Sequence, residues 1–301
     1  MAVAGQRESI PPVGWRVWWL AIRPRTLPAA VGPIAIGTAV AIHEDGFYLP
    51  AALAALAVAL LLQIAANLAN DLFDFKRGAD VARVGPTRVT QSGLVTTRAM
   101  YCATGTVIGL AVIAGLVLVQ RGGWPIFVLG LLSVLSAIAY TAGPYPLGYH
   151  GLGDLFVFLF FGLVGVAGSA YVQTLDLTWF AIAASIPAGA LVTAIIVVNN
   201  LRDIETDRAA KKRTLAVRIG RNGTIGEYSL LISLAYVTPL SLWLNGNLSI
   251  WWWMSWVSVP LAWTLLRKVR SERGRALNPV LAGTAKLSLV FSLLFAGSIV
   301  L

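Results

Sequence analysis

Long stretches without a charged residue constrain the fold of this chain more than any other feature. They run over residues 26–43, 46–70, 99–120, 122–153, 155–175, 177–201 and 228–266. A single bilayer crossing takes roughly 20 apolar residues. Only helices and closed barrels satisfy their backbone groups in lipid, and these runs are too continuous for alternating barrel strands. The sequence therefore predicts an all-α, polytopic membrane protein.

Composition excludes an ordinary soluble domain. Hydrophobic residues make up 57% of the chain and charged residues only 12%, whereas soluble domains carry about 25% charged residues. Splitting the 122–153 stretch near Gly143 and the 228–266 stretch near Gly246 predicts about nine transmembrane helices, the last ending at Leu301.

The basic residues divide unequally between the two sides of such a bundle. When loops are assigned alternately, 22 of the 23 Lys and Arg residues fall on one side and only Arg121 falls on the other. The positive-inside rule then predicts a cytoplasmic N-terminus and cytoplasmic basic loops in the cell inner membrane. The net charge of +10 is explained by this topology, so no nucleic-acid partner is expected.

Acidic residues are scarce, yet two short clusters hold several of the 13. The first comprises Asn67, Asn70, Asp71 and Asp74, with Asp80 beyond it; the second comprises Asn199, Asn200, Asp203 and Asp207. Residues four apart share a helix face, so each cluster projects its oxygens in one direction at a cytoplasmic helix end. The two Asn-x-x-x-Asp cores are 132 residues apart. This spacing predicts one domain, 1–301, with two pseudo-repeated halves (about 15–142 and 150–266) and a last helix (about 280–301).

Two clusters of Asn and Asp oxygens on the same side of a membrane favour a metal site. Mg²⁺ prefers hard oxygen ligands and commonly bridges a few carboxylates to substrate phosphates, and carboxylates at a membrane helix end are a functional hypothesis by default. Solvated helix-end residues would explain one cluster but not two matched ones. Sulfur and histidine ligands are not expected, because the chain has one cysteine and two distant histidines.

Basic residues beside the clusters suit a diphosphate, because Arg binds phosphate in a bidentate manner. Those near the first cluster are Lys76, Arg77 and Arg88; those near the second are Arg202, Lys212 and Arg213. Most of them are equally explained as topology signals.

Five stretches together resemble the UbiA superfamily of intramembrane aromatic prenyltransferases. They are residues 23–30, 67–80, 85–93, 140–154 and 199–216. Within that superfamily they are similar to the 1,4-dihydroxy-2-naphthoate prenyltransferases of menaquinone synthesis, and the 140–154 stretch is the most specific. One departure is Lys211, which stands where glycine is expected before Lys212.

The resemblance implies a bundle around a cavity open to lipid. It implies transfer of a polyprenyl group from its diphosphate to 1,4-dihydroxy-2-naphthoate, with loss of CO₂ and diphosphate, giving demethylmenaquinone. The implied metal is Mg²⁺, held by Asp71, Asp74, Asp203 and Asp207. The amides Asn67, Asn70, Asn199 and Asn200 would be ligands or would orient them, and Lys76, Arg88, Lys212 and Arg213 would contact the diphosphate.

The resemblance leaves several roles open. The acceptor carboxylate has five candidate partners: Arg23, Arg25, Arg88, Gln91 and Tyr145. Asp154 either assists the acceptor or is a favourable charge at a helix N-terminus. Tyr140 and Tyr145 either line the pocket or anchor at the interface.

Three rival interpretations remain. Another aromatic acceptor (4-hydroxybenzoate, homogentisate, or a haem or chlorophyll precursor) is disfavoured by the 85–93 and 140–154 stretches, whereas a phytyl donor is not. A cation-coupled transporter would place carboxylates near mid-bilayer on broken helices, not at cytoplasmic ends. A non-catalytic scaffold leaves the paired clusters unexplained.

Overall fold

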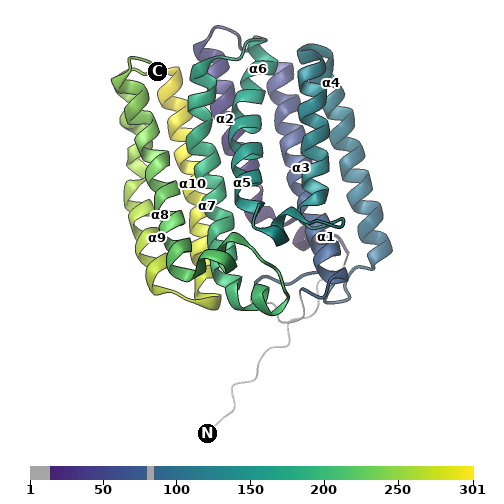
Figure 1. Cartoon of the computed structure of the whole chain (residues 1–301). Coiled ribbons are helices and arrows are strands. Elements are labelled where there is room, and N and C mark those ends of the chain that lie inside the picture. Colours follow the sequence, from purple (N-terminus) through teal and green to yellow (C-terminus); the bar gives the residue numbers. More distant parts are fainter. Residues whose placement is uncertain (1–13, 80–84) are drawn as a thin grey trace.

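The computed structural model describes residues 14–79 and 85–301, and in these ranges it is a bundle of helices without strands (Figure 1). The first elements are α1 (Trp15–Ile22), η1 (Pro24–Thr26), α2 (Pro28–His43), α3 (Leu49–Lys76) and α4 (Thr97–Ala139). The middle ones are η2 (Leu147–His150), α5 (Gly153–Val157), η3 (Phe158–Gly168), α6 (Ser169–Thr174) and α7 (Trp179–Ala209). The last are α8 (Leu215–Leu244), η4 (Ile250–Ser258), α9 (Val259–Ser271), η5 (Gly274–Ala276) and α10 (Leu277–Val300). The predicted all-α class is confirmed.

The predicted count of nine spanning helices is not confirmed. Six helices of the described ranges are long and apolar enough to cross a membrane, or seven if the bent pair Trp15–Thr26 and Pro28–His43 is one span. Part of the difference lies in α4, where two helices meet at Gly123 with a φ of 70°. The predicted breaks at Gly143 and Gly246 lie at φ values of 79° and 75°, a backbone region that favours glycine.

Three long helices begin at a threonine that caps them. The hydroxyl oxygens of Thr96, Thr178 and Thr214 accept hydrogen bonds from the backbone N–H three residues further on, at 3.2, 3.1 and 3.3 Å. Such caps satisfy one of the N–H groups that a helix start leaves without a partner. They fix where α4, α7 and α8 begin, and with that the register of the side chains that follow.

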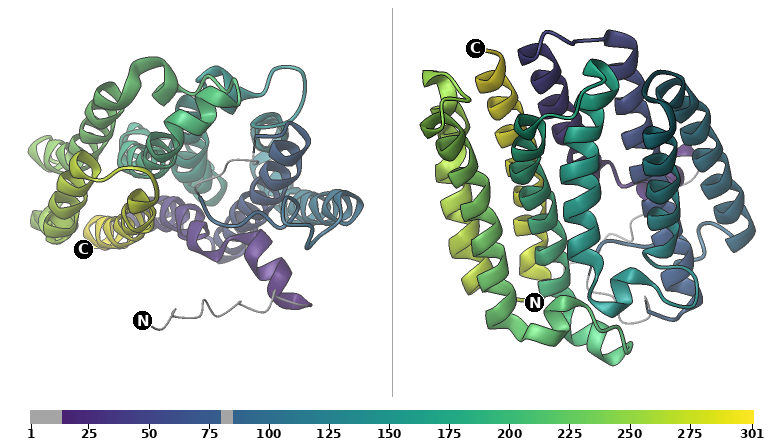
Figure 2. Two further views of the ribbon diagram at one scale, coloured as in Figure 1. Left: turned by 90° about the horizontal axis from the view of Figure 1, so that it is seen from below. Right: turned by 45° about the horizontal axis from the view of Figure 1, so that its top comes forward.

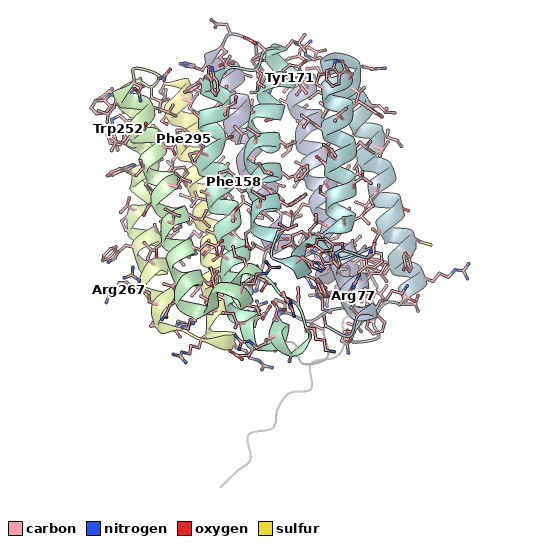
Figure 3. The ribbon with its side chains drawn as sticks, in the orientation of Figure 1. Arg77, Phe158, Tyr171, Trp252, Arg267 and Phe295 are labelled. Carbon is pink, nitrogen blue, oxygen red and sulfur yellow. The ribbon has the colours of Figure 1, made fainter. Side chains whose placement is uncertain are left out.

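The C-terminal ends of α3 and α7 lie at the same end of the bundle, the lower end in Figure 1. The loop that follows each of them is at this end, as is the loop between α4 and α5. Arg77 and Arg267 lie here too, whereas Tyr171 and Trp252 lie toward the opposite end (Figure 3). The two acidic clusters therefore meet on one side of the predicted membrane.

Helix α7 is the central element of the fold. Its most apolar stretch is 78% buried, against 22% for α3. Viewed from below, α8, α9 and α10 lie on one side of the bundle and α3 and α4 on the other (Figure 2). A Cβ added at Gly162 of η3 would lie 2.8 Å from the Cα of Gly189 in α7. Glycine therefore allows the two helices to approach closely beside the cavity described below.

Candidate functional site

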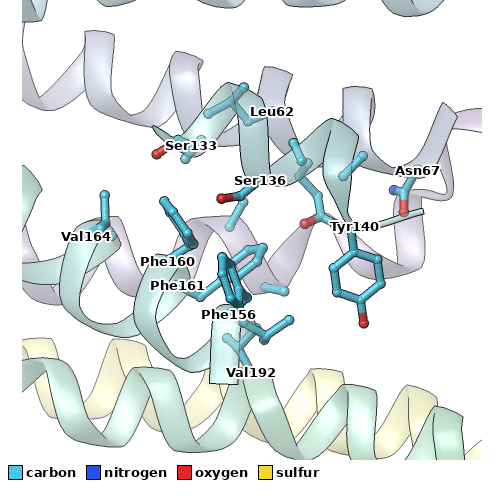
Figure 4. A pocket seen from close by; sticks show the side chains of 18 of the residues that line it. Leu62, Asn67, Ser133, Ser136, Tyr140, Phe156, Phe160, Phe161, Val164 and Val192 are labelled. Carbon is cyan, nitrogen blue, oxygen red and sulfur yellow. The ribbon is translucent and has the colours of Figure 1, made fainter. Parts of the chain in front are cut away.

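A cavity of about 570 Å³ lies between α2, α3, α4, η3 and α7 (Figure 4). Phe156, Phe160, Phe161 and Val164 line its apolar wall. The predicted site residues that line it are Arg23, Asn67, Asn70, Asp74, Arg88, Tyr140, Asn199, Asn200, Asp203, Asp207 and Lys212. Both acidic clusters thus contribute to one cavity that is polar at the lower end of the bundle and apolar above it.

Asp74 is the carboxylate of the first cluster that lines the cavity. It is 3% exposed. Its Oδ1 accepts a hydrogen bond from the Tyr149 hydroxyl at 2.8 Å, and its Oδ2 accepts one from Arg88 Nη2 at 2.9 Å. A buried carboxylate needs such partners, because desolvation of an unpaired charge is costly.

Asp71, predicted as a metal ligand, binds the backbone of the loop after α3. Its side chain is not among those that line the cavity. Its two oxygens accept hydrogen bonds from the backbone N–H groups of Val89 and Thr90, at 3.1 and 3.0 Å. The carboxylate therefore holds the loop after α3 in place, which brings Arg88 to Asp74.

The two asparagines of the first cluster also bind neighbouring segments. Asn67 Nδ2 donates to the carbonyl oxygen of Ile22 at 2.8 Å and to the hydroxyl of Thr26 at 2.9 Å. Asn70 Oδ1 accepts a hydrogen bond from the Thr141 hydroxyl at 3.0 Å. Asn67 thus fixes the turn that places Arg23 at the cavity, and Asn70 fixes the end of α4.

The second cluster is organised by Arg202. Its guanidinium donates to both oxygens of Asp203, at 2.8 and 2.5 Å, and to Asn199 Oδ1 at 2.9 Å. Asp207 lies 3.8 Å from Lys212 Nζ. Asn199, Asp203 and Asp207 all line the cavity, as their four-residue spacing predicts.

Asp154 and Tyr140 lie next to each other at the junction of α4 and α5. Asp154 is 5% exposed, does not line the cavity, and has Asn200 Nδ2 3.5 Å from its Oδ1. Burial, with the charges of Asp154, Asp74 and Asp207, raises the pKa of Tyr140 well above its usual value. The Tyr140 hydroxyl therefore keeps its proton at neutral pH and can donate a hydrogen bond.

Four further predicted site residues are not brought to the cavity. Lys76 Nζ donates to the Tyr101 hydroxyl on α4 at 2.7 Å. Tyr145 stacks on His150 with ring centroids 3.6 Å apart. Gln91 and Arg213 are exposed, and Arg213 contributes its backbone N–H to Tyr149. Arg25, another candidate partner for the carboxylate of the acceptor, is also exposed. Asp80 lies outside the described residues.

Tyr149 is the residue that the sequence analysis missed. Besides its bond to Asp74, its carbonyl oxygen accepts the backbone N–H of Arg213 at 2.9 Å. Lys212 Nζ lies 4.9 Å from the centroid of its ring. Tyr149 therefore joins the first cluster to the loop after the second. Its place in the 140–154 stretch was the only signal in the sequence.

Lys211 has a backbone conformation that glycine adopts more easily than other residues. Its φ is 56°, in the left-handed region. A non-glycine residue there costs about 1–2 kcal/mol. The expectation of glycine before Lys212 therefore has a local physical reason.

The donor set suits Mg²⁺ in chemistry. Asp74, Asp203 and Asp207, with the nearby amides, supply the hard oxygens that this ion prefers. Within the described residues, no group of three or more His, Cys, Asp or Glu side chains is close enough to hold a metal ion. A metal between the clusters would therefore need further oxygen ligands from a bound molecule.

Comparison with known proteins identifies close relatives. The model of the UbiA prenyltransferase family matches residues 30–293. A 1,4-dihydroxy-2-naphthoate octaprenyltransferase of Mycobacterium tuberculosis is 42% identical over 94% of this chain and 96% of its own length. The Escherichia coli protein of the same name is 38% identical over 93% of this chain and 94% of its own.

A solved structure has the same fold. The UbiA homologue from Archaeoglobus fulgidus bound to GPP and Mg²⁺ aligns with a TM-score of 0.69 over 94% of this chain and 99% of its own, at 16% identity. At this level of identity the likeness concerns the fold alone.

Proposed function

Because this chain belongs to the UbiA prenyltransferase family, we propose that it transfers a polyprenyl group from an allylic diphosphate to 1,4-dihydroxy-2-naphthoate. The allylic C–O bond breaks and diphosphate leaves. A C–C bond forms at the ring carbon that carries the carboxylate, and the carboxylate leaves as CO₂. The product is demethylmenaquinone in its reduced form, an intermediate of menaquinone synthesis.

The observation that supports this proposal most is a single cavity with two chemically different ends. Asp74, Asp203 and Asp207 line it together with Phe160, Phe161 and other apolar side chains. A polyprenyl diphosphate has the same division, because its tail is soluble in lipid and its head is highly charged. In this proposal the head binds at the polar, lower end of the cavity and the tail extends along its apolar part toward the membrane.

Magnesium would be held between Asp74 of α3 and Asp203 and Asp207 of α7. When bound, it supplies neutralisation of the charge that develops on the departing diphosphate. The amides Asn70, Asn199 and Asn200 orient these carboxylates or bind beside them. The UbiA homologue from Archaeoglobus fulgidus, whose fold this chain shares, has been solved with GPP and Mg²⁺ bound, which supports a metal-dependent transfer.

The remaining residues bind substrate and exclude water. Arg88 and Lys212 contact the phosphate oxygens, and bonds of this kind are stronger than neutral ones. The faces of Phe156, Phe160 and Phe161 shelter the positive charge of the allylic carbon. Arg23 lines the cavity, its backbone oxygen accepts a hydrogen bond from Thr26, and its guanidinium would receive the acceptor carboxylate.

The proposed orientation has the diphosphate end facing the cytoplasm. The basic loops lie at the same end of the bundle as both acidic clusters, and positive loops remain on the cytoplasmic side. We infer that in a bacterial cell the protein lies in the inner membrane, with the diphosphate entering from the cytoplasmic leaflet.

The test is an assay of the purified protein in lipid nanodiscs with Mg²⁺. Polyprenyl and phytyl diphosphates are compared as donors, and 1,4-dihydroxy-2-naphthoate and 4-hydroxybenzoate as acceptors. We expect a decarboxylated, prenylated naphthoquinol from the polyprenyl donor. Prenylation of 4-hydroxybenzoate alone would overturn the acceptor assignment, and a preference for the phytyl donor would overturn the tail assignment.

A further inference from the structure

Arg202 lies inside the second acidic cluster and binds the oxygens on which the proposed function relies. It donates to both carboxylate oxygens of Asp203 and to Asn199 Oδ1. Its side chain is 1% exposed and that of Asp203 is 9% exposed. A guanidinium therefore lies, inside the protein, against the carboxylate that the proposed function assigns to the metal.

The same arrangement recurs at the other carboxylates of the cavity. Asp74 is paired with Arg88 at 2.9 Å, and Asp207 with Lys212 at 3.8 Å. The acidic side chains that line the cavity are Asp74, Asp203 and Asp207. Each of them thus has a cationic partner in the described structure, and the formal charges of the three pairs balance.

We propose that Arg202 is a resident counter-cation of the second cluster, which makes metal and diphosphate bind together rather than separately. A divalent ion that arrives alone must compete with a buried, bidentate guanidinium, and it adds two positive charges to pairs that already balance. When a diphosphate arrives with the metal, its negative charge compensates that addition. Arg202 is then released from Asp203 toward the phosphate oxygens.

A second observation supports the same conclusion. Within the described residues, no cluster of three acidic or other ligating side chains is assembled for a metal. The described residues therefore offer no ready set of three close ligands, and the carboxylates that line the cavity are already paired with cations. Diphosphate oxygens supply both further ligands and negative charge.

Arg202 also connects the cluster to the last helix. Its Nη1 donates to Asn278 Oδ1, near the start of α10, at 2.8 Å. Leu281, one turn further along α10, lines the cavity. Movement of Arg202 from Asp203 toward a diphosphate would therefore change a contact between α7 and α10.

The test measures binding of Mn²⁺ to the full-length protein in nanodiscs by electron paramagnetic resonance, without and with inorganic pyrophosphate. In the unmodified protein, pyrophosphate is expected to tighten Mn²⁺ binding by about tenfold or more, a normal size for coupled ligands. In Arg202→Gln, Mn²⁺ alone should bind about tenfold more tightly, and the effect of pyrophosphate should shrink to about threefold or less.

Three variants complete the design. Arg202→Lys keeps the positive charge and should keep most of the coupling. Arg208→Gln removes an exposed cation from the same helix, paired only with the exposed Glu205, and should change neither binding step. Asn278→Ala removes a partner of Arg202 outside the cluster. If Arg202→Gln does not fold, Asn278→Ala should still tighten Mn²⁺ binding, by a smaller factor.

Two outcomes separate this inference from the proposed function on which it rests. If Arg202→Gln and Asn278→Ala bind Mn²⁺ no more tightly than the unmodified protein, and coupling persists, then Arg202 has a structural role only. If the unmodified protein binds no Mn²⁺ even with pyrophosphate, the proposed metal and diphosphate site itself is wrong.

Discussion

The hydroxyl of Tyr149 donates a hydrogen bond of 2.8 Å to Oδ1 of Asp74, and this bond joins the loop between α4 and α5 to the end of α3. The other oxygen of Asp74 is bound by Arg88. The carboxylate is therefore held in one orientation from two sides. Since the loop residue also binds Arg213 through its carbonyl oxygen, the geometry of both clusters depends on this short segment.

Replacement of Tyr149 by phenylalanine should therefore impair the reaction without unfolding the protein. A hydrogen bond to an ionised group contributes about 1.5–3 kcal/mol, so we expect kcat/KM to fall roughly ten- to hundredfold. Steady-state kinetics over a range of Mg²⁺ concentrations measures the effect. Tyr145→Phe is the matched control, because Tyr145 is exposed and stacks on His150. Equal losses in both variants would show that the bond to Asp74 is unimportant.

Asp71→Ala and Asp203→Ala should differ in their effects on structure. Asp71 binds the backbone of Val89 and Thr90, so its loss should expose the loop after α3 to proteases as well as reduce activity. Asp203→Ala should abolish activity and leave cleavage of that loop as it is in the unmodified protein. Limited proteolysis in nanodiscs, with the fragments identified by mass spectrometry, distinguishes the two. Unchanged cleavage of the loop in Asp71→Ala would contradict its role as a loop anchor.

Substitution of Lys211 by glycine should stabilise the protein. Its φ of 56° is strained for lysine, and relief of that strain, less the entropy cost of glycine, is worth up to about 1 kcal/mol. Lys211→Ala removes the charge but keeps the unfavourable φ, so it should give no gain. Thermal unfolding of the three proteins in the same detergent compares them. An equal rise in Tm for both variants would assign the effect to charge.

Gly153→Ala should disturb Tyr140. A Cβ at this position would lie 2.7 Å from the Tyr140 hydroxyl oxygen, a contact that forces the ring to move. We expect a lower kcat/KM, and less than additive loss when Gly153→Ala is combined with Tyr140→Phe, because the two changes act on one group. Gly105→Ala is the control, because a Cβ there meets no atom within 4 Å. Strictly additive losses would show that Gly153 acts elsewhere.

The distribution of charge in the sequence predicted the membrane helices, and residue spacing predicted which side chains share one face of a helix. Charge-free stretches indicated membrane helices, and the four-residue steps from Asn199 to Asp207 predicted side chains that share the cavity. Within a single helix, spacing and side-chain type are enough for such an inference. The break between the stretches 99–120 and 122–153 is present as well, because two helices meet at Gly123 inside α4, whereas the count of nine spans is not confirmed.

Contacts between distant segments were beyond the reach of the sequence. Asp71 and Asp74 look equivalent there, but one binds backbone amides of the following loop and the other faces the cavity. Tyr149, an uncharged residue in a loop, gave no sign that it binds a carboxylate 75 positions earlier. Lys76 and Arg213 were expected at the cavity because they are basic and lie next to the acidic clusters in the sequence. Whether such a side chain reaches the cavity depends on the direction in which the helix or loop points it.

The central claim is that α3 and α7 hold one metal-bound diphosphate between them. Calorimetric titration of inorganic pyrophosphate with Mg²⁺ into the unmodified protein, Asp74→Ala, Asp203→Ala and the double variant tests it most directly. We expect each single variant to lose Mg²⁺-dependent binding and the double variant to lose no more than either. Independent, additive losses, or undiminished binding in either single variant, would contradict a shared site.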